Sequence, residues 1–163
     1  MNDVGPPSVD GDELATLTAF LDYLRDRIVA KLTGVDDAAA RTSQVASGTT
    51  IYWLGTHMAA VEINQSQRIL DGRAEDALVP PPPPAAEHDS MTDVVARYES
   101  VCDESRRILS GFDDLGAVGR GVDRKTGGAR TVRWVLTHLI EETARHAGHL
   151  DILREQLDGS AGR

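Results

Sequence analysis

The chain has 163 residues, of which 40% are hydrophobic and 26% charged, as in a globular protein that buries one core. Its formal net charge of -9 disfavours a nucleic-acid partner, because binding to phosphates requires a basic face. A single cysteine excludes an internal disulfide, and no segment reads as a signal peptide or a membrane span. We therefore expect one cytoplasmic domain over residues 1–163, with no membrane partner.

The first half of the chain contains two predicted helices. Residues 1–10 lack periodicity and are expected to form a loose arm. Leucines and an isoleucine then recur at spacings of three and four, which predicts a helix over residues 11–32. A segment rich in turn-forming residues follows, and a second apolar stripe predicts a helix over residues 50–72.

A proline run separates the two halves of the predicted bundle. Five consecutive prolines lie within residues 79–89, and they forbid helix and favour a stiff extended segment. A ligand for an SH3 or WW domain is one interpretation, but a crossover connection between helices is favoured. A third helix is predicted over residues 90–112, and Cys102 lies in its apolar stripe, so we expect a small core residue there and not a nucleophile.

The segment between the third and fourth helices is rich in glycine and charge, and it predicts a long loop with at most a small hairpin. Its "RKT" does not form a phosphate-binding loop, because Arg124 stands where that motif requires glycine. Thr131 is a suitable N-cap for the fourth helix, predicted over residues 131–157. Four amphipathic helices without strand patterns predict an all-α four-helix bundle with a long crossover connection.

The fourth helix carries the strongest chemical signal. Its stretch "HLIEETARHAGHLDIL" holds three of the five histidines of the chain. At about 100° per residue, His146 lies within the apolar stripe and Glu142 at its edge, whereas Glu141 points to solvent. Residues four apart are neighbours on a helix, so Glu142 and His146 can bind one metal ion together.

A third candidate ligand lies on the second helix. His57, in "WLGTHMAAVE", lies on the apolar side of that helix. Facing helices would then supply two histidines and one carboxylate, a set that leaves coordination positions open. The alternatives are a solvated Glu142–His146 pair and a hydrogen-bonded core histidine at position 57.

The stretches "SGTTIYWLGTHMAAVE" and "TVRWVLTHLIEETARHAGHLDILREQLDG" resemble the DinB-like superfamily of metal-binding four-helix proteins, over about residues 12 to 159. The nearest branch contains the actinobacterial mycothiol S-transferases, and the mycothiol-dependent maleylpyruvate isomerase is more distant. The resemblance implies His57, Glu142 and His146 as metal ligands, with His149 supporting them from behind. It gives His138 a packing or supporting role and His88 no role as a ligand.

The resemblance implies a divalent metal, expected to be zinc, with nickel, manganese or iron as alternatives. The metal would activate mycothiol as a bound thiolate for conjugation to a small electrophile, a detoxification step. Two other functions stay open: hydrolysis of an amide or ester by metal-activated water, and a non-catalytic metal-stabilised bundle. The resemblance to this family also implies a homodimer.

Overall fold

The computed structural model describes residues 5–9, 11–80 and 89–160. Within those ranges the chain is helical, and the predicted all-α class is confirmed. The long elements are α1 (Glu13–Leu32), α3 (Ile51–Glu62) with its π-helical continuation η1 (Ile63–Leu70), α4 (Met91–Leu109) and α5 (Val132–Asp158). Two short elements are α2 (Asp37–Ala40) and the 3-10 helix η2 (Glu75–Ala77).

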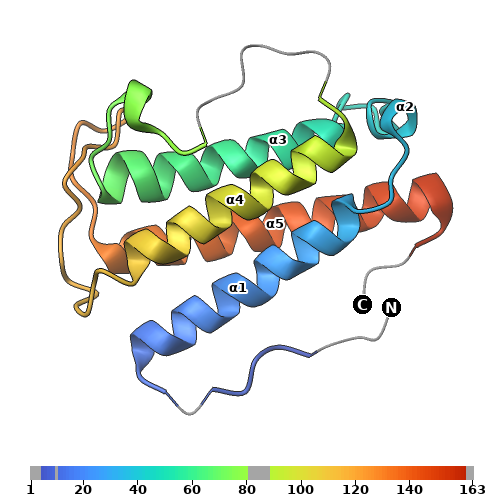
Figure 1. Ribbon diagram of the computed structural model, residues 1–163. Helices are drawn as coiled ribbons and strands as arrows, with labels where there is room; N and C mark the ends of the chain where they lie inside the picture. The colour runs from blue at the N-terminus through green and yellow to red at the C-terminus, as the bar shows by residue number, and fades with distance from the viewer. Residues whose placement is uncertain (1–4, 10, 81–88, 161–163) are drawn as a thin grey trace.

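The four long helices pack as a bundle in which α1 and α5 run in one direction and α3 and α4 run in the other (Figure 1). Helix α5 packs against both α1 and α3, and α4 completes the bundle on the opposite side. Since α3 and α4 are parallel neighbours, the chain has to return along the length of the bundle between them. This explains the long connection that the proline run predicted.

Side-chain caps begin the helices where the sequence changes character. Thr50 accepts a hydrogen bond from the backbone N–H of Trp53 at the start of α3. Thr131 does the same for Trp134 at the start of α5, as predicted. Gly159 ends α5 at φ +75°, a left-handed conformation that glycine adopts without steric cost.

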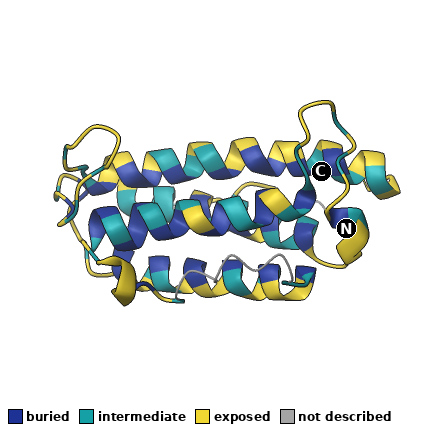
Figure 2. Cartoon of the chain, turned by 90° about the horizontal axis from the view of Figure 1, so that it is seen from above, coloured by how far each residue is buried: buried dark blue, intermediate teal, exposed yellow. Residues whose placement is uncertain are grey.

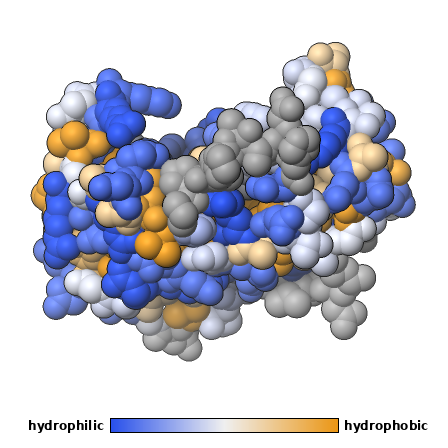
Figure 3. All heavy atoms as spheres, turned by 45° about the horizontal axis from the view of Figure 1, so that its top comes forward, coloured by the Kyte–Doolittle hydropathy of each residue, from blue (hydrophilic) through white to orange (hydrophobic). Residues whose placement is uncertain are grey.

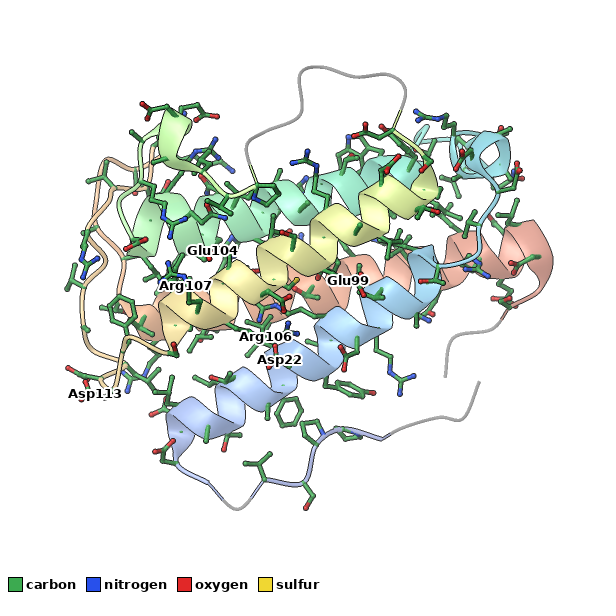
Figure 4. All side chains as sticks on the ribbon, viewed as in Figure 1. Asp22, Glu99, Glu104, Arg106, Arg107 and Asp113 are labelled. Carbon is green, nitrogen blue, oxygen red and sulfur yellow. The ribbon has the colours of Figure 1, made fainter. Side chains whose placement is uncertain are left out.

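A buried polar layer divides the core near its middle. Two clusters of buried apolar residues fill the two ends of the bundle, and Figure 2 shows buried residues along all the long helices. Between them Arg25 donates to both carboxylate oxygens of Glu62, at 2.7 Å each, and to the hydroxyl of Ser105 at 2.8 Å. Arg25 is 1% exposed and Glu62 is fully buried. Asp22 of α1 joins this layer to α4, because it accepts from Arg25 and from Arg106 at 2.9 Å each (Figure 4).

Two details of the fold differ from the sequence predictions. Residues 63–70 continue the second helix as a π-helix and not as an α-helix, and α2 lies in a segment predicted to be irregular. The loop before the last helix contains, in the described ranges, one isolated bridge between Val118 and Thr131, which is within the prediction of at most a small hairpin. Parts of the arm over residues 1–10 and of the connection over 79–89, and all of His88, lie outside the described residues.

The glycine-rich loop approaches η1 closely at Gly121. The backbone N–H of Gly121 donates to the carbonyl of Ile69 at 3.0 Å. A Cβ at Gly121 would lie 1.9 Å from the carbonyl oxygen of Arg68, so a side chain has no room there. Gly121 therefore serves packing, in agreement with the rejection of a phosphate loop.

Hydrophobic residues on the face seen in Figure 3 form small groups among hydrophilic ones. Over the ranges that the structure describes, no helix has the length and apolarity to cross a bilayer.

Candidate metal centre

The three side chains predicted as metal ligands converge between α3 and α5. One donor atom from each of His57, Glu142 and His146 lies within 4.8 Å of the others. Oε2 of Glu142 is 3.2 Å from Nε2 of His146 and 4.0 Å from Nε2 of His57. The two imidazole rings meet edge to face, with centroids 4.9 Å apart. The structure thus brings together, across two helices, residues separated by about half the chain.

The helix periodicity explains why these side chains face one another. On α5, Leu139, Thr143 and Leu150 are fully buried, which orients His146 inward and leaves Glu142 at the rim. The side chains of His57, Glu142 and His146 are 32%, 20% and 11% exposed, so the site opens to solvent on the α3 side. Glu142 lies at the edge of the buried face and Glu141 is exposed, as predicted.

A tryptophan orients His57. Trp53 lies one turn earlier on α3, and its ring stacks on the imidazole with centroids 4.8 Å apart and planes 7° apart. This contact restricts the ring of a half-exposed histidine, which would otherwise have several rotamers. Sequence reasoning missed Trp53, although its i,i+4 spacing to His57 was available as a signal.

His149 contacts His146 from the side away from Glu142. The two Nδ1 atoms are 3.3 Å apart, so one of them donates a proton and the other accepts it. When Nδ1 of His149 accepts the proton of Nδ1 of His146, Nε2 of His146, which faces Glu142, is the nitrogen free to bind an ion. His149 therefore lies where the sequence analysis expected it.

The electrostatics of the site suit a cation. Burial, together with the neighbouring His57, lowers the pKa of His146, and Glu142 acts in the opposite direction. In the described part of the chain the ion pairs of Glu142 are with the two histidines and not with an arginine or lysine. A half-buried carboxylate with only imidazole partners, at metal-ligand spacing, fits a divalent ion.

A second group of candidate ligands shares Glu142 but is chemically weaker. His138 and Glu141 have donor atoms within 4.8 Å of each other and of Glu142. Glu141, however, forms an ion pair with Arg145, whose positive charge opposes a metal ion there. His138 packs against the ring of Trp134, with centroids 4.9 Å apart, which agrees with its predicted packing role.

Cys102 lies in the core and takes no part in this cluster. It is 2% exposed, and burial, followed by the charge of Glu62, raises the pKa of its thiol well above the usual range. A thiol protonated in this way is a poor nucleophile. The structure therefore supports the prediction of a core residue.

The all-helical architecture of the described residues is consistent with a DinB-like helical bundle. A sequence model of the mycothiol S-transferase family matches residues 16–159. The chain belongs to this family. A comparison with curated proteins gives no match.

Among solved structures, a conserved protein from Enterococcus faecalis has a similar fold, with a TM-score of 0.66. The two share 16% sequence identity, and the alignment covers 92% of this chain and 99% of that one. At this identity the likeness concerns the fold alone.

Proposed function

We propose that the protein is a divalent-metal-dependent transferase that conjugates a low-molecular-weight thiol, mycothiol, to an electrophile. The observation that carries the proposal is the convergence of His57, Glu142 and His146 on one point, in a chain of the mycothiol S-transferase family. Each ligand type is one that zinc accepts, and three protein ligands leave a position for a substrate. Zinc is our expected metal, with nickel, manganese or iron as alternatives.

A bound zinc-like ion supplies the activation of the thiol, because a thiol that coordinates such an ion loses its proton at neutral pH. The protein's own residues provide the binding site and its orientation. Trp53 holds the ring of His57 and His149 holds that of His146, so both ligands are preorganised before the ion arrives. The nucleophile comes from the added thiol, since Cys102 is buried elsewhere in the core.

Metal-assisted hydrolysis is the alternative that the same ligand set supports. There the open position would hold water, and an amide or ester would be cleaved without any added thiol. A non-catalytic metal-stabilised bundle is the third candidate. Dependence on added thiol separates transfer from hydrolysis, and turnover separates both from binding alone.

The test measures thiol-dependent conjugation of an electrophile by wild-type protein, by metal-stripped protein and by reloaded protein. We expect activity in the first and third samples and none in the second. Glu142→Gln keeps the shape but removes the anionic oxygen, so metal affinity and transfer should each fall at least about tenfold. Glu142→His should restore metal binding, because histidine at i−4 reaches the same ion.

Two controls make the test specific. Glu141→Gln changes the adjacent exposed carboxylate and should leave transfer unchanged. Cys102→Ser should stay active, since the nucleophile is external. Activity that is independent of added thiol, or lost in Cys102→Ser at normal metal content and folding, would refute the proposed mechanism.

A further inference from the structure

A cavity whose described lining residues include no carboxylate, lysine or arginine, and which we call the uncharged cavity, lies beside the candidate metal centre. Its volume is about 280 Å³, and its walls come from the loop before α3 and from the second half of α5. The lining residues are Val45, Ser47, Thr49, His149, Ile152 and Leu153. Apolar side chains form most of this wall, and two hydroxyl groups lie on the loop.

The loop wall is held in place by its own hydrogen bonds. The hydroxyl of Ser43 donates to the carbonyls of Val45 and Thr49, at 2.9 Å each. Gly48, at φ +79°, closes a turn by donating to the carbonyl of Val45 at 3.0 Å. The hydroxyls of Ser47 and Thr49 are 3.0 Å apart. The cavity is therefore formed without a ligand, as small-molecule sites usually are.

The cavity is joined to the candidate centre through one side chain. His149 lines it, and Nδ1 of His149 is 3.3 Å from Nδ1 of His146. A molecule in the cavity thus lies one imidazole ring from a proposed ligand. Ile152 lines the same cavity and is 53% exposed, so its apolar surface is available for contact with a bound molecule.

A second cavity of about 430 Å³ provides a contrast. It lies between α1 and α4, and its lining includes Arg25, Asp26, Glu99, Asp103 and Arg106. Figure 4 shows Glu99 and Arg106 on the α4 side of this region. Neither a proposed ligand nor His149 lines this second cavity, and its charges disfavour an apolar molecule.

We infer that the uncharged cavity binds the electrophilic substrate, and that this substrate is a small, uncharged molecule with an apolar body and one hydrogen-bonding group. The volume limits the bound part to about the size of a single ring or a short chain. The apolar walls favour its body, and the hydroxyls of Ser47 and Thr49 suit its polar group. The inference rests on the proposed function for the role of this molecule as a substrate, but the binding site itself can be tested separately.

Benzyl alcohol is a suitable unreactive probe, and benzoate is its anionic counterpart. Titration is followed through the NMR methyl signals of Val45, Ile152 and Leu153, with the metal content measured in each sample. We expect benzyl alcohol to shift these signals saturably and benzoate to bind at least about tenfold more weakly, because the mostly apolar wall contains no lysine or arginine to compensate a carboxylate. Absence of saturable shifts at the three methyls overturns the inference.

Variants locate the effect. Ile152→Asp places a charge on the cavity wall at an exposed position, so it should weaken the binding of benzyl alcohol at least about tenfold. Ile152→Ala should have an affinity between those of the wild type and Ile152→Asp. Val122→Asp is the matched control: Val122 is an apolar residue of similar exposure, 57%, in the loop at the opposite end of α5. The Val122→Asp variant should bind benzyl alcohol with the affinity of the wild type. Equal binding by Ile152→Asp and the wild type overturns the assignment.

Kinetics connect the cavity to the reaction. Ile152→Asp should raise the KM for an apolar electrophile and leave the KM for the thiol and the metal content unchanged. A raised KM for the thiol alone would overturn the assignment, because the cavity would then belong to the other substrate. Suppose that the wild type neither binds metal nor transfers thiol, but binds benzyl alcohol, and that Ile152→Asp does not bind it. The proposed function then fails, and the cavity stands as a site for uncharged apolar molecules.

Discussion

Replacing Glu62 by glutamine should be among the most damaging conservative substitutions in this bundle. Glu62 is fully buried, and its two oxygens accept separate hydrogen bonds of 2.7 Å from Nε and Nη2 of Arg25. Glutamine preserves the volume but can accept only through one oxygen, and its NH₂ group then faces an N–H donor of the guanidinium. Arg25 would keep Asp22, which is one-third exposed, as its anionic partner.

The expected loss follows from the burial of both partners. Breaking a buried pair from one side costs about 3–5 kcal/mol, because the remaining charge is left in the core. Since Asp22 still compensates part of the charge of Arg25, we expect the lower end, about 3 kcal/mol. That is a large share of the 5–15 kcal/mol or so that stabilises a typical domain. In Arg25→Met/Glu62→Leu both charges are removed, so most of the loss should be recovered.

Urea unfolding followed by circular dichroism at 222 nm measures these differences. All samples are stripped of metal first, because a ligand bound only to the folded state would mask the change. Glu75→Gln is the control. The side chain of Glu75 is 57% exposed and forms an ion pair with Arg68, and the loss of this exposed pair should not shift the urea midpoint measurably. A loss below about 1 kcal/mol in Glu62→Gln, or a double variant less stable than the single one, would refute this reasoning.

Three further predictions concern the loop, the core thiol and the site. Gly121→Ala should destabilise the protein by about 1–3 kcal/mol, because its Cβ would meet a backbone oxygen. Gly128→Ala, in the same loop, should change the stability little, since its Cβ has room. The urea midpoints of the two variants distinguish these outcomes. Cys102 should resist iodoacetamide in the folded protein and react once unfolded. Its raised folded pKa also means that its contribution to stability is complete below about pH 8.5 and declines at higher pH, which a pH series with Cys102→Ala as reference would show. Trp53→Ala should weaken metal affinity several-fold without unfolding the protein, because His57 loses the ring that orients it; competition with a chromogenic chelator measures this.

The helices and two candidate ligands were predictable because helix geometry is local. The spacing of apolar residues placed His146 inside the buried stripe of α5 and Glu142 at its edge, and the structure has them so. That α3 faces α5 at His57 depends on bundle packing, which periodicity does not determine; the sequence offered this pairing as a hypothesis, and the family resemblance implied the same three residues.

Contacts set by packing between helices were not predictable from periodicity. Arg25 lies 37 positions from Glu62, and nothing in the local pattern of α1 distinguishes a buried arginine from a solvated one. The π-helical η1 was missed for a related reason. Its apolar residues recur much as they do in an α-helix, and the change of hydrogen-bond register leaves no simple signature.

The central claim is that His57, Glu142 and His146 hold one divalent metal ion. Metal analysis of purified wild-type protein, His57→Ala, His146→Ala and His138→Ala tests it most directly, because His138 belongs to the competing group with Glu141. We predict about one ion per chain in the wild type and in His138→Ala, and severe loss in the other two. Equal metal content in all four proteins, or loss in His138→Ala with retention in His57→Ala, would contradict the proposed centre.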